Sequence, residues 1–323
     1  MSLTKLRLSM VGTLTLLIAL STLFFTVVLS LLGTLNLFSL AFLVVLFNIA
    51  QWLFAPYLIN AMYRVKEVTA SDGSGLHGMV ERLSGRLGLK MPKVMIADIP
   101  IPNAFAYGSP IAGSRVAVTT GLLRELQGEE VEAVLGHELG HLKNRDVQIM
   151  MFASVLPAIF YFVGYSMMMS TWYSGGRQRE GGGAAPMLIG IGSMVIYYVL
   201  TLLVLGLSRL REYYADQRSV SIVQDGARKL SEALAKIVSS ASKMKLRRQS
   251  GLNFNSFKAL FIEDPDRAER DEVAMSSARM FKTDQHLVQE ILSRKVSPVD
   301  RLLELLSTHP NVVKRLQALQ ERT

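Results

Sequence analysis

The chain has 323 residues, half of them hydrophobic, and its mean hydropathy is +0.30. This composition is too apolar for an ordinary soluble domain and predicts segments that lie in a membrane. The absence of cysteine excludes disulfides and thiolate-based structural zinc sites, so any metal must be held by histidine and carboxylate side chains. We attribute the formal charge of +9 to cytoplasmic loops that face anionic lipid, because no nucleic-acid-binding motif is present.

A long uncharged segment opens the chain. Leu8–Tyr63 contains no charged side chain and no histidine, and a spanning helix needs about 20 apolar residues, so the segment holds two spans. The turn-like residues 33–36 divide it into spans at 10–32 and 37–59. A cleaved signal peptide is the alternative for the first span, but the apolar run is too long for one and a second span follows at once. The positive-inside rule predicts that both ends of this hairpin are cytoplasmic, next to Lys5, Arg7, Arg64 and Lys66.

The next segment has the patterns of a soluble domain. Ser71–Asp72 offers an N-cap for an amphipathic helix that closes at Gly88. Lys93–Ala97 and Arg115–Thr120 are typical of short strands. Between them, Ile101–Gly108 has strand character and is bounded by proline and glycine, which suits the edge of a sheet. Such an edge can bind an extended peptide by strand addition, although an ordinary hairpin arm explains the pattern equally well.

The segment Val131–Asp146 reads VEAVLGHELGHLKNRD and contains the motif H-E-x-x-H. On a helix, positions four apart differ by only about 40° in direction, so His137 and His141 can bind one zinc ion together. Glu138 follows the first histidine, and its carboxylate can reach a water at the metal without binding the metal itself. The apolar periodicity and the acidic start of the segment favour a helix. This arrangement is what metal-assisted peptide hydrolysis requires.

Two further uncharged segments follow, at 147–176 and 181–208. They predict a third and a fourth span at 149–170 and 187–207. The polar, glycine-rich loop between them is flexible by composition. If the first hairpin leaves the soluble domain in the cytoplasm, this loop lies outside, although Arg177 and Arg179 count slightly against that.

The two histidines need a third protein ligand, and the sequence after the fourth span offers one. Helical spacing puts Glu212 and Asp216 on one face, four positions apart. Glu212 can complete the metal site, and Asp216 can accept the free N–H of a ligand histidine and so fix its tautomer. A solvated helix with paired charges would explain the segment alone, but the two histidines favour the metal site.

The C-terminal part, residues 217–323, is charged and predicted to be helical. Amphipathic patterns cover Ala227–Val238 and His286–Leu292, and a last helix carries Val313, Leu316 and Leu319. Lys243–Arg248 is typical of a solvated or lipid-facing surface. His309 precedes a proline, so we expect its backbone to be extended and its ring to be presented from a loop. Taken alone, the residue is interpreted as structural.

Four segments together resemble one family. They are HELGH, the upstream NAFA, the downstream RxREYxAD, and STHP followed by an arginine near the end. In this order they resemble the HtpX-type membrane zinc endopeptidases, which are gluzincins related to the CAAX prenyl endopeptidases. The resemblance extends over nearly the whole chain, and the order of the segments is more specific than HELGH alone.

The resemblance implies roles for individual residues. The zinc ligands would be His137, His141 and Glu212, and Glu138 would be the catalytic acid and base. Asp216 would orient a ligand histidine, His309 would help to stabilise the oxyanion, and Arg315 would tie the C-terminal helix in place. The strand that holds substrate would include Asn103, Ala104, Phe105 and Ala106. Tyr107 and Asn311 stand where the family commonly has threonine and proline, and this could alter substrate preference.

The predicted fold is therefore a mainly α membrane protein, with four transmembrane helices and an α+β gluzincin-type zinc protease domain that has a small sheet. Transmembrane hairpins occupy 1–66 and 147–208, and the protease domain occupies 67–146 and 209–323. The resemblance implies quality control of misfolded or damaged membrane proteins, with polypeptides and the lipid bilayer as partners. No phosphate-binding loop is present in the sequence, so no nucleotide is expected.

Two other functions were weighed. An intramembrane zinc protease carries its H-E-x-x-H inside a span, but here charged residues flank the motif, and burying them in hydrocarbon would cost about 2.5–3.5 kcal/mol each. A non-proteolytic membrane scaffold or regulator with a structural zinc is the remaining alternative. A closed structural site has no need of an acid beside its first ligand, so Glu138 favours the protease.

Overall fold

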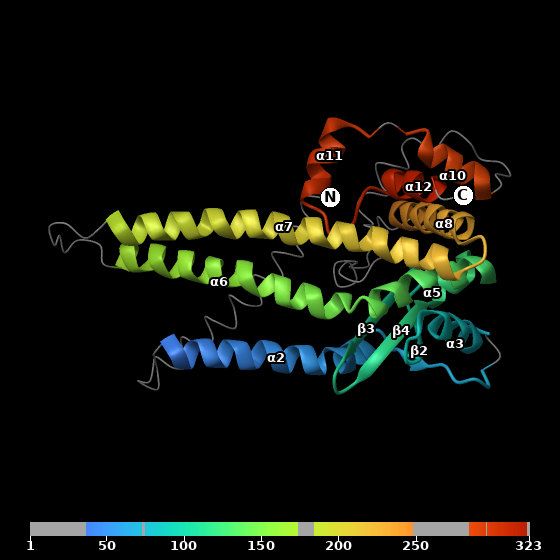
Figure 1. The fold of residues 1–323 in the computed structure, drawn as a ribbon, viewed down its shortest axis with the longest axis horizontal. Helices are drawn as coiled ribbons and strands as arrows, with labels where there is room; N and C mark the ends of the chain where they lie inside the picture. Colours follow the sequence, from blue (N-terminus) through green and yellow to red (C-terminus); the bar gives the residue numbers. More distant parts are fainter. Residues whose placement is uncertain (1–36, 73–74, 174–183, 248–283, 295, 322–323) are drawn as a thin grey trace.

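The computed structural model describes residues 37–72, 75–173, 184–247, 284–294 and 296–321. Figure 1 shows three long helices that extend in one direction from a unit of shorter helices and a sheet. The long helices are α2 (Leu37–Met62), α6 (Asp146–Tyr173) and α7 (Ala184–Ile222). Of these, α6 and α7 pack side by side.

The structure describes three of the four predicted spans. The first, at 10–32, lies outside the described residues, whereas α2, α6 and α7 cover the other three as continuous helices. Among the described residues, one helix is long and apolar enough to cross a membrane, namely Met187–Ile222. Four spans therefore stay a prediction.

The helix α7 continues well beyond the predicted fourth span. Its 39 residues rise about 58 Å, which is nearly twice the ~30 Å thickness of a hydrocarbon core. No glycine or proline interrupts it after Gly206, so the segment with Glu212 and Asp216 belongs to the same helix. One element thus links the predicted span to the unit that holds the sheet.

A mixed sheet of four strands forms within the described residues. The strands are β1 (Lys66–Glu67), β2 (Lys93–Ala97), β3 (Ala104–Ser109) and β4 (Gly113–Thr119), in the order β1-β2-β4-β3. β2 and β4 are parallel, and the other neighbouring pairs are antiparallel. β3 therefore lies at an edge of this sheet and is also the arm of a hairpin with β4, so its predicted edge position is confirmed, and peptide binding there stays a prediction.

Both faces of the sheet are covered. Val94, Val116 and Val118 point into the main core, which is formed with α3 (Leu76–Leu87), α5 (Gly128–Lys143), α8 (Gly226–Arg247) and α12 (Val312–Gln320). Phe105 and Ala117 belong to a second cluster with Tyr63, just after the end of α2. The sheet is thereby fixed to the helix that is predicted to be the second span.

The predicted boundaries of α3 and β4 need small corrections. α3 ends at Gly88 with a φ of 60°, as expected, but its N-cap is Gly75 and not Ser71–Asp72. The reason is that the Asp72 carboxylate accepts a hydrogen bond from the backbone N–H of Thr69 and so closes an earlier turn. β4 ends at Thr119, whose Oγ1 accepts from Leu122 N and caps α4 (Thr120–Glu125).

The described residues of the C-terminal part are mainly helical, as predicted. α8, α10 (Asp284–Leu292), α11 (Pro298–Leu305) and α12 follow α7 in order. Val313, Leu316 and Leu319 are buried on the inner face of α12. In Figure 1, α8, α10 and α12 gather at one end of α7, and α11 lies nearer to its middle.

Candidate metal centre

The helix α5 carries the H-E-x-x-H motif into the interior. Its N-terminus is closed by a reciprocal capping box between Gln127 and Glu130. His137 and Glu138 are both buried, whereas His141 is partly exposed. The helix thus presents the motif from a rigid, well-capped element.

Two glycines allow α7 to approach α5 closely. A Cβ at Gly136 would lie 2.9 Å from the Ser219 Oγ, and one at Gly140 would lie 3.1 Å from the Ala215 Cα. The Ser219 hydroxyl uses this proximity to donate a hydrogen bond of 2.6 Å to the Ala133 carbonyl. A side chain at either glycine would push α7 outward, together with Glu212.

The three predicted ligands converge on one point. The two Nε2 atoms of His137 and His141 are 3.1 Å apart. Glu212 Oε2 lies 3.6 Å from His137 Nε2, and Glu212 Oε1 lies 3.5 Å from His141 Nε2. Around a tetrahedral zinc with bonds of 2.0–2.1 Å, donor atoms are separated by about 3.3 Å. The three residues therefore fit a zinc ion.

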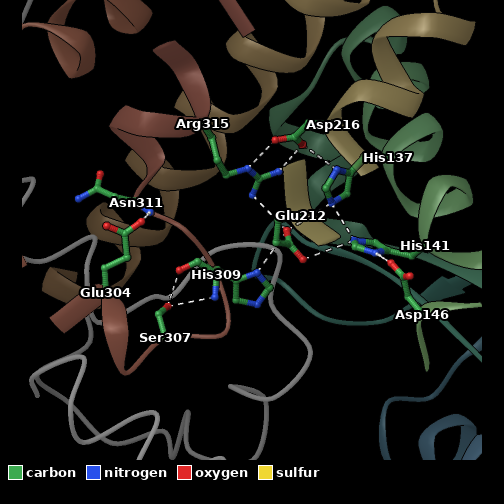
Figure 2. A network of polar contacts seen from close by, with 10 residues as sticks. All are labelled: His137, His141, Asp146, Glu212, Asp216, Glu304, Ser307, His309, Asn311 and Arg315. Atoms are coloured by element: carbon green, nitrogen blue, oxygen red, sulfur yellow. Dashed lines mark hydrogen bonds and ion pairs between the residues drawn. The ribbon is translucent and has the colours of Figure 1, made fainter. Parts of the chain in front are cut away.

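The outer nitrogen of each histidine faces a carboxylate. His137 Nδ1 lies 2.8 Å from Asp216 Oδ1, and His141 Nδ1 lies 2.6 Å from Asp146 Oδ2. Each Nδ1 therefore carries a proton in the neutral ring, and the Nε2 lone pairs point toward the convergence point (Figure 2). Asp216 has the position that the sequence predicted for it.

Asp146 was not predicted as part of this site. α5 ends at Lys143, with Asn144 as its C-cap, and does not continue into the predicted third span. Arg145 adopts a left-handed conformation with a φ of 54°, and Asp146 then begins α6. This sharp turn brings its carboxylate back to His141, where Arg211 also binds it at 2.9 Å. The available signal was an aspartate five positions after the second histidine.

A buried arginine joins the end of the chain to the site. The Arg315 side chain is 0% exposed, and its Nε and Nη2 donate to the two Asp216 oxygens at 2.9 and 2.6 Å. Its Nη1 lies 3.5 Å from Glu212 Oε2. The ion pair ties α12 to α7 at the level of the three candidate ligands, which is the place that the resemblance implied for Arg315.

The electrostatics of the site distinguish the two histidines. Burial alone would lower the pKa of His137, but its hydrogen bonds with Asp216 and Glu212 outweigh that effect and raise its pKa to about 10. Burial lowers the pKa of His141 to about 4. Burial would raise the pKa of the Glu212 carboxyl, yet His309 and His137 hold it well below its usual range. At pH 7 the metal-free pair of histidines thus carries one positive charge, because the His137 ring binds a second proton and the His141 ring does not.

His309 approaches the site from the loop after α11. Its Nδ1 lies 3.3 Å from Glu212 Oε2, on the opposite side of that carboxylate from the histidine pair (Figure 2). The Ser307 Oγ lies 3.0 Å from His309 N and accepts from it, which fixes the backbone of the loop. The loop that contains the His-Pro sequence thus brings the His309 ring next to the candidate ligand Glu212.

The strand β3 contacts α5 beside the motif. Ala104 and Phe105 are buried in the two cores, and Ala106 is half-buried. Asn103 lies just before the strand, and its backbone is paired with Thr119. The side chains of this segment mainly hold the strand, so a substrate would meet its backbone edge.

The two departures from the family pattern have structural roles. The Tyr107 hydroxyl lies 2.7 Å from the Asn60 side-chain amide of α2, and burial raises the Tyr107 pKa to about 12. The Asn311 Oδ1 accepts from Val313 N and caps α12, and its own backbone N–H donates to the Glu304 carboxylate. A proline at this position could not make that second bond.

Comparison with known proteins identifies the family. The model of peptidase family M48 matches residues 70–323. The chain belongs to this family. A protease HtpX homologue of Thermoplasma acidophilum is 36% identical over 298 residues, which are 89% of this chain and 88% of that protein. One of Aeropyrum pernix is 38% identical over 288 residues, which are 89% and 86% of the two chains.

Membership of family M48 makes the chain a metalloprotease and confirms the resemblance to HtpX-type enzymes. The solved structure of S. mikatae Ste24p aligns with a TM-score of 0.55 at 17% identity and covers 96% of this chain. This chain spans 65% of the Ste24p chain. The likeness confirms the mainly helical fold with a small mixed sheet.

Proposed function

We propose that this metalloprotease is a multi-pass membrane endopeptidase that uses one zinc ion to hydrolyse misfolded or damaged membrane proteins at the cytoplasmic face. The observation that carries the proposal is the convergence of three side chains that could hold a metal ion, on the helix that carries Glu138 and on its neighbour α7. The partners are polypeptide substrates and the lipid bilayer. Family membership favours this function over that of a scaffold with a structural zinc.

The metal would be held by His137, His141 and Glu212. Their donor atoms have separations of 3.1–3.6 Å, and the histidine tautomers leave both Nε2 lone pairs available. Zinc bound there would act as a Lewis acid on the peptide carbonyl and would lower the pKa of water toward ~7. Among the described residues three ligands converge, and three protein ligands with a position left for water are typical of a catalytic zinc site, whereas a structural site has four.

Glu138 would move the proton during hydrolysis. As the residue after His137 on α5, it is the buried carboxylate nearest in sequence to the first ligand. Its carboxylate oxygen takes a proton from the attacking water and passes it to the nitrogen of the leaving amine. Asp216 keeps the His137 ring in its ligating tautomer, and His309 faces the site from the other side of Glu212 to assist the oxyanion.

The edge strand β3 would bind the substrate. Its far edge has no neighbouring strand among the described residues, and the strand contacts the helix that carries Glu138. An extended polypeptide can pair with such an edge through its backbone, which needs little sequence specificity. Such backbone pairing suits an enzyme whose substrates are misfolded proteins that have no sequence motif in common.

The membrane placement rests on two hairpins at 1–66 and 147–208. α7 supports it, because many large apolar side chains on its predicted span are exposed, among them Leu188, Ile189, Val195, Tyr198 and Leu203. Basic residues flank the first hairpin and favour a cytoplasmic protease domain. The metal site then lies at the cytoplasmic surface of the bilayer, where membrane-bound substrates are accessible.

Removal of the metal tests the proposed function. We expect the full chain in proteoliposomes to cleave casein and an unfolded membrane protein, to lose activity with 1,10-phenanthroline and to regain it with added zinc. Mass spectrometry of the products, compared with those of the Glu138→Gln variant, would identify the bonds that this enzyme cuts. Cleavage that persists without metal would contradict the zinc mechanism.

The affinity for zinc should depend on pH. Since the pKa of His137 is about 10 and that of His141 about 4, one proton must leave when the metal binds near neutral pH. A rise in pH removes this competition, so the apparent association constant should increase about tenfold per unit between about pH 6.5 and 8. Competition with a chelator of known pH dependence measures this slope. A slope of zero would contradict the proton assignment.

A further inference from the structure

The short helix α11 exposes an apolar face. Val299, Leu302 and Leu305 are 57%, 64% and 54% exposed, and their spacing of three places them on one side of the helix. The opposite side buries Leu303 against the rest of the protein. A capping box between Ser297 and Asp300 closes the N-terminus, and Pro298 begins the first turn. The apolar side chains are thus displayed by a well-formed helix.

A groove with basic residues adjoins this face. It has a volume of about 460 Å³, and we call it the basic groove; it is lined by Arg209, Pro298, Arg301, Leu302, Glu304, Leu305 and Lys314. Its carboxylate, Glu304, already pairs with Lys314 and accepts from the Asn311 backbone. Arg301 is exposed, and no ion pair of it is found among the described residues. With three cations and one carboxylate, the basic groove is suited to an anion.

The location of this surface relates it to the predicted membrane. Arg209 lies two positions after the predicted fourth span, which is a rise of about 3 Å along α7. Its Nη1 donates to the carbonyls of Glu304, Leu305 and Ser307 at 2.7–3.0 Å and thereby fixes the end of α11 at this level. Figure 1 shows α11 beside α7, closer to the apolar part of that helix than α10 and α12 are.

We propose that α11 is an interfacial helix that inserts Val299, Leu302 and Leu305 into the bilayer surface and binds the phosphate of an anionic phospholipid in the basic groove. Apolar side chains next to cations, of which Arg301 is exposed, at the level where the predicted span ends, are the combination that such helices use. If this face bound a protein partner instead, nothing would explain why it lies at the level where the predicted span in α7 ends. The inference rests on the proposed span in α7 but not on the proposed proteolysis.

Site-specific labelling tests this proposal, because the chain has no cysteine of its own. A spin label at Leu302→Cys in the full chain would be compared in bilayers of phosphatidylcholine with and without phosphatidylglycerol. We expect collisions with a water-soluble nickel chelate to fall and collisions with oxygen to rise, most strongly with the anionic lipid. The Arg301→Gln exchange should weaken this docking about fivefold, since one cation near an anionic surface contributes roughly that factor. Lys90→Gln, which removes an exposed cation on the loop after α3, should not weaken it.

Two further labels separate the possible outcomes. Leu203→Cys lies on the exposed face of the predicted span, and Gln289→Cys lies on α10. If the Leu203 label is in hydrocarbon but the Leu302 label is as accessible to nickel as the Gln289 label, the inference is wrong and the span stands. If the Leu203 label is in water, the membrane proposal fails as well. If the Leu302 label is shielded from both reagents, protein covers α11. If free glycerol phosphate reproduces the effect of the anionic lipid, the ligand is a soluble phosphate. Either result overturns the inference.

Discussion

Glu138→Gln is expected to reduce kcat/KM for casein by about 10²–10⁴-fold, the usual contribution of a general acid–base group. Glutamine has nearly the same shape, but its amide cannot accept the proton of the attacking water. The metal content should stay unchanged, because the ligands His137, His141 and Glu212 are intact and Glu138 is not among the converging donors. Initial rates and metal analysis of the same preparation measure both quantities.

A matched control exists on the same helix. Glu132→Gln makes the same chemical change on α5, at a side chain that is paired with Arg82 at 3.4 Å near the surface. This variant should keep its activity within about twofold, because exposed ion pairs contribute little to stability. If the Glu138→Gln variant retains zinc and cleaves casein at the rate of the unmodified enzyme, the catalytic assignment is wrong.

The parts of the site that depend on local helix geometry could be predicted from the sequence. His137 and His141 lie on one face of α5 because they are four positions apart, and Glu212 and Asp216 share a face of α7 for the same reason. That the two faces meet was inferred from the need for a third ligand and from the family resemblance. The structure brings them together through the close helix contact that Gly140 permits.

Other parts depend on contacts that no local pattern specifies. Asp146 reaches His141 only because Arg145 adopts a left-handed conformation, which the sequence does not indicate. Because Asp146 stands between the motif and a predicted span, the sequence favoured interpreting it as a charged residue that only flanks the motif. The roles of Tyr107 and Asn311 were also not foreseen, since each depends on a tertiary partner: Asn60 of α2 for the first and Glu304 of α11 for the second.

Arg315→Met is expected to lower the free energy of unfolding by about 3–5 kcal/mol, because it leaves the buried Asp216 carboxylate without the guanidinium that binds both of its oxygens. The zinc affinity should fall about 10–100-fold, since Asp216 would no longer be held against His137 Nδ1. Thermal denaturation of the metal-free protein in detergent measures the first effect, and competition with a chelator measures the second.

A double variant distinguishes charge burial from a simple loss of packing. In Arg315→Met with Asp216→Asn, the guanidinium and the carboxylate that it binds are removed together, and the asparagine oxygen can still accept from His137 Nδ1. We therefore expect the double variant to be more stable than Arg315→Met alone, although its zinc affinity stays below that of the unmodified enzyme. Arg82→Met, which removes an exposed arginine from a 3.4 Å ion pair, should cost less than about 1 kcal/mol. If the double variant is no more stable than Arg315→Met, the arginine contributes mainly by filling space between α7 and α12, and the carboxylate it binds does not need its charge.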